Sequence, residues 1–128
     1  MRAKILVVDD NPINLKLASD VLAFEGHDIL TAVDAEEAQL VLAENLPDLI
    51  LMDIALPGMD GLTLTRILKA DARTRQVRIV ALTAFAMKGD DQKALDAGCD
   101  GYIIKPIDTR KFPAQVATFL EGQPADTA

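Results

Sequence analysis

Four short apolar runs in this chain each end in a residue whose side chain is charged or carries a hydroxyl. The runs are Lys4–Val8 before Asp9 and Asp10, Leu49–Met52 before Asp53, Arg78–Leu82 before Thr83, and Tyr102–Ile104 before Lys105 and Pro106. If these runs are neighbouring parallel strands, their carboxyl ends meet at one edge of one sheet. Three carboxylates, a hydroxyl and an ammonium would then converge there. Such a set suits a divalent cation and a phosphoryl group.

The spacing of the apolar runs predicts the fold class. Runs of four to six residues alternate with longer segments of helical period, which is the pattern of an α/β domain with a parallel sheet. The length of 128 residues is that of one domain. We therefore expect one folded domain over residues 1–121, followed by a short polar tail over residues 122–128.

A fifth apolar run, Asp28–Thr31, ends in no residue of this kind. This run is the second along the chain. Placing it at the edge of the sheet gives the strand order 2-1-3-4-5, the doubly wound flavodoxin-like (βα)5 fold. In this winding the ligand crevice lies where the first and third strands diverge. Those two strands end in Asp9, Asp10 and Asp53, so topology and chemistry indicate the same place.

The first helix has clear signals at its start. Asn11 is a suitable N-cap, and Pro12 occupies the first helical position, where proline is tolerated. The spacing of the following residues predicts a face that points toward the core. That face comprises Asn14, Leu17, Ala18, Val21 and Leu22.

The crowded carboxylates indicate a magnesium-assisted reaction. Carboxylates that lie close together repel one another unless a cation joins them, and oxygen ligands on a partly open site suit Mg²⁺. We expect Asp9 and Asp10 to hold the metal together with Asp53, and the carbonyl of Ala55 to complete the coordination. Asp53 lies on the central strand and is the expected nucleophile toward a phosphoryl donor. Lys105 and Thr83 would stabilise the transferred group.

At these residues the chain resembles the receiver domain of two-component response regulators over nearly its whole length. The resemblance implies that Asp53 accepts a phosphoryl group from a histidine kinase or a histidine phosphotransfer protein, with Mg²⁺ as cofactor. It also implies that Thr83 and Tyr102 act as a switch, that the face of helix four, strand five and helix five changes, and that the Lys105–Pro106 bond is cis. The motifs that carry the resemblance are Asp9-Asp10, Asp53, Pro57–Gly61, Thr83-Ala84 and Lys105-Pro106.

Charge and composition limit the partners. The net charge of −7 disfavours binding to nucleic acid, and the apolar run after the N-terminus is too short for a signal peptide or a membrane span. We expect a cytoplasmic monomer or weak dimer that meets a kinase or phosphotransfer protein and a downstream protein target. Pro12 and Ile13 are either a simple helix start or an apolar docking spot for a kinase helix.

Two other functions on a related fold conflict with the same residues. A haloacid-dehalogenase-type enzyme needs a second aspartate two residues after the nucleophile, where this chain has Ala55. A flavodoxin-like carrier of flavin mononucleotide would repel its phosphate from Asp9 and Asp10. Two alternatives stay open, namely a receiver that is part of a hybrid histidine kinase and a phosphorylation-independent adaptor. The function that we predict ahead of these alternatives is that of a phosphoacceptor, which catalyses only its own phosphorylation and dephosphorylation.

Overall fold

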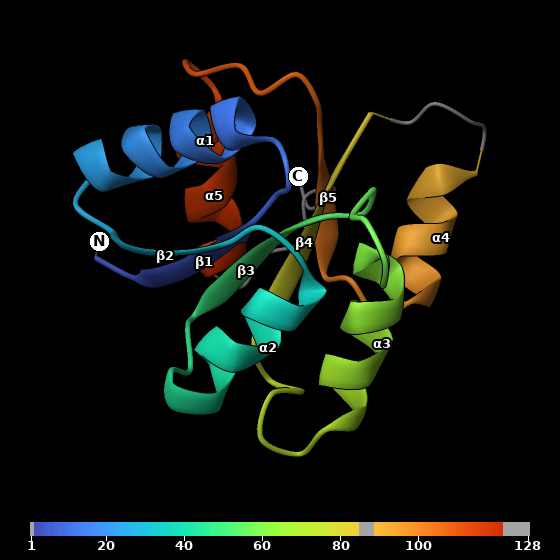
Figure 1. Ribbon diagram of the computed structural model, residues 1–128. Helices are drawn as coiled ribbons and strands as arrows, with labels where there is room; N and C mark the ends of the chain where they lie inside the picture. The colour runs from blue at the N-terminus through green and yellow to red at the C-terminus, as the bar shows by residue number, and fades with distance from the viewer. Residues whose placement is uncertain (1, 85–88, 122–128) are drawn as a thin grey trace.

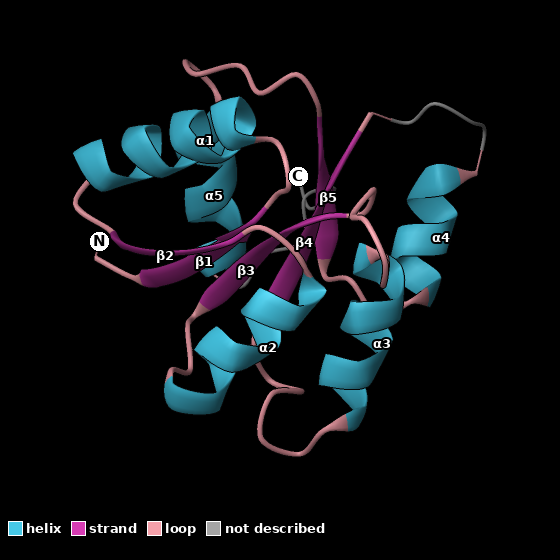
Figure 2. Ribbon diagram, in the orientation of Figure 1, coloured by secondary structure: helices cyan, strands magenta, loops and turns pink. Residues whose placement is uncertain are grey.

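Five parallel strands alternate with five helices in the computed structural model, which describes residues 2–84 and 89–121 (Figures 1 and 2). The predicted tail over residues 122–128 lies outside the described residues. No helix in the described part of the chain is long and apolar enough to cross a membrane. In chain order the elements are β1 (Lys4–Val8), α1 (Pro12–Phe24), β2 (Asp28–Ala32), α2 (Ala35–Glu44), β3 (Leu49–Asp53), α3 (Gly61–Ala70), β4 (Arg78–Thr83), α4 (Asp90–Asp96), β5 (Gly101–Ile104) and α5 (Phe112–Leu120).

The strand order is β2-β1-β3-β4-β5, so the predicted fold is confirmed. Helices cover both faces of the sheet: α1 and α5 lie on one face, and α2, α3 and α4 lie on the other (Figure 1). Successive side chains of a strand point to opposite faces. In β1, Leu6 therefore packs in the core under α2 and α3, while Ile5 and Val7 pack under α1 and α5. This burial on both faces explains why the strands read as continuous apolar runs.

The register of the strands brings the polar ends to one level. Val8 pairs with Met52, so the residues that follow them, Asp9 and Asp53, emerge side by side. Thr83 ends the next strand, β4. Parallel pairing therefore gathers the carboxyl ends of β1, β3, β4 and β5 at one edge, as the sequence predicted, while β2 lies at the outside.

Helix α1 begins as predicted, but one residue of its expected inner face is exposed. The side chain of Asn11 accepts hydrogen bonds from the N–H groups of Ile13 and Asn14 and so caps the helix. Leu22 and Ala18 are buried in the core. Leu17 is 37 % exposed. The predicted inner face is wider than the part of α1 that contacts the sheet, and Leu17 lies at the edge of that part, beside a groove.

Candidate functional site

A pocket of about 340 Å³ opens at the carboxyl ends of the strands. Six residues predicted to bind metal or phosphoryl group all line it, namely Asp9, Asp10, Asp53, Ala55, Thr83 and Lys105. The pocket is therefore assembled from the ends of β1, β3 and β4 and from the residue after β5. Pro106 lines an adjacent groove instead, together with Lys105 and Leu17. Tyr102 lies on β5 and packs against the core beneath α2, α3 and α4.

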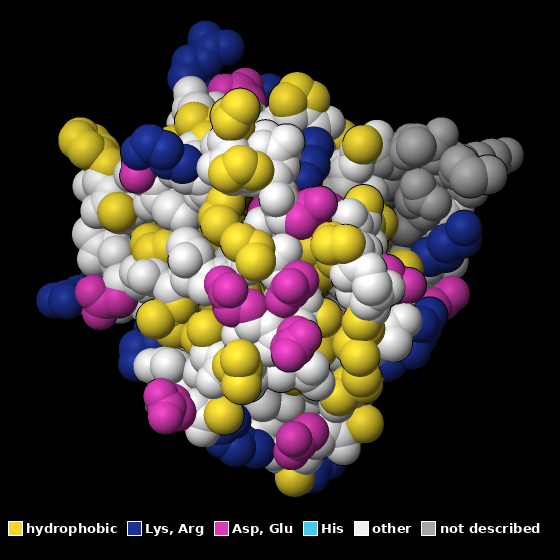
Figure 3. All heavy atoms as spheres, in the orientation of Figure 1, with side chains coloured by type: hydrophobic (Ala, Val, Ile, Leu, Met, Phe, Trp, Pro, Cys, Tyr) yellow, Lys and Arg dark blue, Asp and Glu magenta, His cyan; other side chains and the backbone are white. Residues whose placement is uncertain are grey.

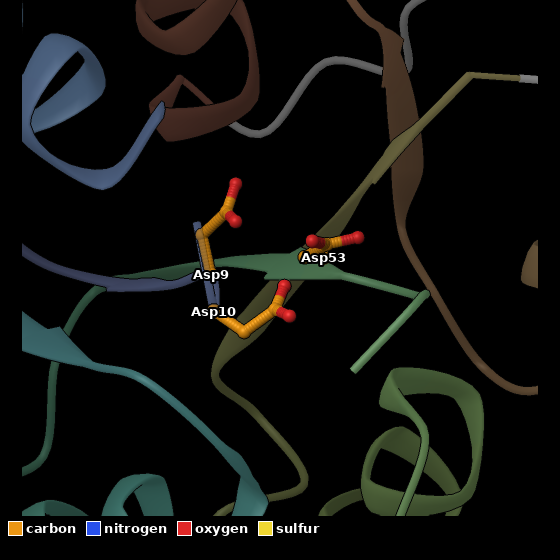
Figure 4. Close-up of side chains that lie close together, drawn as sticks. All are labelled: Asp9, Asp10 and Asp53. Atoms are coloured by element: carbon orange, nitrogen blue, oxygen red, sulfur yellow. The ribbon is translucent and has the colours of Figure 1, made fainter. Parts of the chain in front are cut away.

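Three carboxylates lie together at the ends of β1 and β3 (Figure 4). Asp9, Asp10 and Asp53 each offer an oxygen within 4.8 Å of the others. Asp9 and Asp53 are only 1 % and 5 % exposed, whereas Asp10 is exposed. Two buried acids beside an exposed one form a partly open, all-oxygen donor set. That donor set fits a hard divalent cation such as Mg²⁺.

The side chain of Lys105 forms hydrogen bonds with both buried carboxylates. Its ammonium Nζ donates a hydrogen bond to Asp9 Oδ2 at 3.0 Å and to Asp53 Oδ2 at 3.2 Å. The three carboxylates still carry more negative charge than this one ammonium neutralises. The excess negative charge favours a cation in the pocket.

The pKa values of Asp9 and Lys105 are both raised. For Asp9 the main cause is burial, which disfavours the charged carboxylate more than the N–H of Asn11 and the ammonium of Lys105 favour it. For Lys105, burial would lower the pKa, but its hydrogen bond to Asp9 and the charges of Asp53 and Asp9 outweigh that effect. The ammonium therefore stays protonated at neutral pH.

Local backbone contacts fix the orientation of Asp53. Its Oδ1 atom accepts a hydrogen bond from the N–H of Ala55 at 2.9 Å. The first residue of α3, Gly61, packs against the end of β3, where a Cβ atom would lie 2.3 Å from Asp53 O. Only glycine fits this close approach. The contact of Ala55 with Asp53 is made by its N–H group. The role of its carbonyl as a metal ligand stays a prediction.

Thr83 and Tyr102 lie on the same face of the sheet. Tyr102 pairs with Ala81, two residues before Thr83, and alternation along a strand puts those two residues on one side. The N–H of Lys105 donates to Thr83 O at 2.8 Å. The Lys105–Pro106 bond is cis, which confirms that expectation.

Two asparagines at the start of α1, its N-cap and a residue of its first turn, also line the pocket, and sequence reasoning missed them as site residues. The sequence indicates a capping role for Asn11 and an inner-face position for Asn14, yet both line the pocket together with the carboxylates. Their spacing of three residues is the signal that could have found them, because it places both on one side of the first turn.

Figure 3 draws the molecule in the orientation of Figure 1, and acidic side chains gather near the middle of the face that it shows.

Comparison with known families and curated proteins gives a consistent result. The family described as the response regulator receiver domain matches residues 5–117. The polar-differentiation response regulator DivK of Brucella ovis is 39 % identical over 120 residues, which cover 94 % of this chain and 98 % of that protein.

Solved structures share the fold over almost the full length. A CheY-like response regulator receiver domain protein from Methanospirillum hungatei has a TM-score of 0.86 and 28 % identity, and the match covers 99 % of this chain and 100 % of that one. The signal receiver domain of a histidine kinase from Syntrophus aciditrophicus has a TM-score of 0.86 and 29 % identity, with 98 % and 95 % covered. The second relative shows that this fold also occurs within histidine kinases.

Proposed function

The chain belongs to the response regulator receiver domain family, and from this premise we propose that it is a signalling switch whose Asp53 accepts a phosphoryl group. One observation carries the proposal. Asp53 lies in a single pocket between the acidic pair Asp9 and Asp10 on one side and Thr83 and Lys105 on the other. The phosphoryl donor is a phosphohistidine of a kinase or of a phosphotransfer protein. The protein acts on its own aspartate and not on a separate substrate.

In the transfer step, a carboxylate oxygen of Asp53 attacks the phosphorus of the donor. A P–O bond forms as the P–N bond breaks, and the electron pair of the broken bond stays on the leaving imidazole, which takes up a proton. The product is an aspartyl phosphate. Lys105 is already bonded to Asp53 Oδ2 and so stands next to the new bond. Its ammonium and the hydroxyl of Thr83 stabilise the negative charge of the transferred oxygens.

Mg²⁺ is the cofactor of the proposed reaction. Asp9, Asp10 and Asp53 would hold the ion, together with the carbonyl of Ala55. When bound, the ion supplies positive charge toward the phosphoryl oxygens. Asn11 shapes this part of the pocket, because its N–H donates to Asp9 Oδ1 at 2.9 Å and fixes that carboxylate.

The switch proper involves Thr83, Tyr102 and Pro106. Thr83 turns toward the phosphoryl group, and Tyr102, on the same face of the sheet, turns inward in response. The changed face of α4, β5 and α5 then controls a downstream protein. Pro106 keeps Lys105 in place at the end of β5.

The phosphodonor protein docks beside the pocket, at the start of α1. Ile13 is 77 % exposed there, and Leu17 is 37 % exposed. A groove of about 310 Å³ continues from Leu17 to Pro106 and Ile107. Exposed apolar side chains this close to the acceptor suit the apolar face of a partner helix.

Phosphorylation by a small donor tests the proposal. The protein is incubated with Mg²⁺ and acetyl phosphate, and the intact mass is measured for a labile phosphoryl adduct. We expect the adduct in the natural chain and its absence in Asp53→Asn and after removal of Mg²⁺ by a chelator. An adduct that persists in Asp53→Asn, or none in the natural chain, would overturn the assignment.

A further inference from the structure

Three consecutive residues before β5 contact one face of α3. Gly98, Cys99 and Asp100 form what we term the α4–β5 turn, since they connect those two elements. On α3, Thr65 and Lys69 are four residues apart and therefore lie on the same face of the helix. The turn is held against α3 along this line of side chains.

Lys69 makes most of the polar bonds of this contact. Its ammonium donates hydrogen bonds to the carbonyl oxygens of Arg75, at 3.2 Å, and Val77, at 2.8 Å, and to Asp100 Oδ2 at 3.0 Å. These acceptors match the three donors of a lysine ammonium. The Lys69 side chain is 20 % exposed, so solvent screens the ion pair only in part.

Asp100 extends the contact to the sheet. Its Oδ2 atom also accepts a hydrogen bond from the N–H of Ile79 at 2.8 Å, and its own N–H donates to Ile79 O at 2.7 Å. One carboxylate thus joins α3, the start of β4 and the α4–β5 turn.

Gly98 and Cys99 complete the contact. Gly98 has a φ of +105°, and a Cβ atom there would lie 3.0 Å from Lys69 Cγ, so a larger residue would push the turn away from α3. The buried thiol of Cys99 lies 3.9 Å from Thr65 Oγ1, to which it donates. Burial raises the pKa of this thiol to about 11, so it keeps its proton and stays a donor at neutral pH.

The same face of α3 reaches the phosphoacceptor at its other end. Thr65 Oγ1 donates a hydrogen bond to Gly61 O at 2.8 Å, and Gly61 packs directly on the backbone of Asp53. The ten residues of α3 form a rigid element of about 15 Å. One helix therefore touches the backbone of Asp53 at its start and the turn before β5 along its length.

We infer that Thr65 and Lys69 are positioning residues that couple the phosphoacceptor end of β3 to the start of β5. The inference rests on the proposed function of Asp53. With both contacts made, the α4–β5 turn is a fixed anchor, so a displacement at the end of β3 reaches β5 through α3. Without them, a loose turn absorbs the displacement before it reaches β5.

Hydrogen exchange with mass spectrometry tests this coupling. The protein is measured with and without Mg²⁺ and beryllofluoride, a phosphoryl mimic, and the ligand-dependent change in peptides covering residues 97–104 is compared. We expect this change to fall to less than half in Lys69→Met and in Thr65→Val. Lys16→Met is the matched control, because it removes an exposed ion pair on α1 and should keep the full change.

The readout is a difference between ligand states, which a merely structural role would leave intact. Fluorine-19 NMR shows whether each variant binds beryllofluoride, and circular dichroism shows whether it folds. If both variants bind the mimic and keep the full exchange change, the coupling is overturned and the proposed function stands. If the natural chain neither binds the mimic nor forms an adduct at Asp53, the proposed function fails and the inference with it. If Lys69→Met does not fold, Thr65→Val decides, because it replaces only a hydroxyl by a methyl group.

Discussion

The ammonium of Lys105 bonds Asp9 and Asp53 at once, at 3.0 and 3.2 Å from one Oδ2 atom of each. Asp9 directly follows β1 and Asp53 ends β3, so the lysine bridges a proposed metal ligand and the proposed phosphoacceptor. One ammonium thus bonds two of the three carboxylates that form the proposed metal site. We therefore expect Lys105 to oppose metal binding and to favour phosphoryl acceptance.

Replacing Lys105 by methionine should separate these two effects. Removing a competing charge worth ~1 kcal/mol should raise the affinity for Mg²⁺ about fivefold. Adduct formation from acetyl phosphate should slow by roughly 100-fold, because a charge that faces the phosphoryl oxygens is lost. Calorimetry and intact mass measure the two quantities. Weaker binding of Mg²⁺ by the variant would contradict this view of the lysine.

Ile13→Asp should impair transfer from a protein donor and spare transfer from a small one. The side chain is 77 % exposed next to the pocket but does not line it. With a phosphorylated histidine phosphotransfer protein, we expect the transfer rate to fall by roughly tenfold, since an apolar contact becomes a charge. The rate with acetyl phosphate should not change. Leu40→Asp, at an exposed position on α2, is the control and should behave as the natural chain with both donors.

Gly61→Ala should slow adduct formation as well as reduce stability. A Cβ at this position meets Asp53 O at 2.3 Å, so the acceptor must shift. Gly101→Ala is the matched control, because its Cβ would meet Phe119 Cε1 at 2.2 Å in the core, away from the acceptor. We expect each variant to lose about 1–3 kcal/mol in urea unfolding. Only Gly61→Ala should form the adduct more slowly under conditions where both are folded.

The buried thiol of Cys99 should make stability depend on pH in the alkaline range. Burial raises its pKa from 9.0 to about 11, so below pH 9 the thiol is protonated in both the folded and the unfolded protein. Between pH 9 and 11 the unfolded chain loses the proton more readily, and the free energy of unfolding falls by about 1.4 kcal/mol per pH unit. Urea unfolding of Cys99→Ala across the same range should lack this component. Equal pH dependence in both proteins would show that the thiol is not protected.

Much of the site could be predicted because strand ends are encoded locally. An apolar run that stops at Asp9, Asp53 or Thr83 marks both the strand and its polar end. The absence of such a residue after Asp28–Thr31 then fixed the edge strand. The prediction was weaker along α1, where Leu17 was placed inward and is exposed. Periodicity gives the direction of a helix face but not the width of the strip that the neighbouring sheet covers.

The sequence by itself determined the strand order, the charged and hydroxyl-bearing residues at the carboxyl edge of the sheet, and the family. These follow from short-range patterns and from the rule that parallel strands end at the same edge. Only the tertiary structure decided which atoms meet there: Lys105 bonds both Asp9 and Asp53, and Asn14 enters the pocket. Such contacts depend on register, side-chain direction and close packing between residues far apart in the chain, and no local pattern encodes those distances.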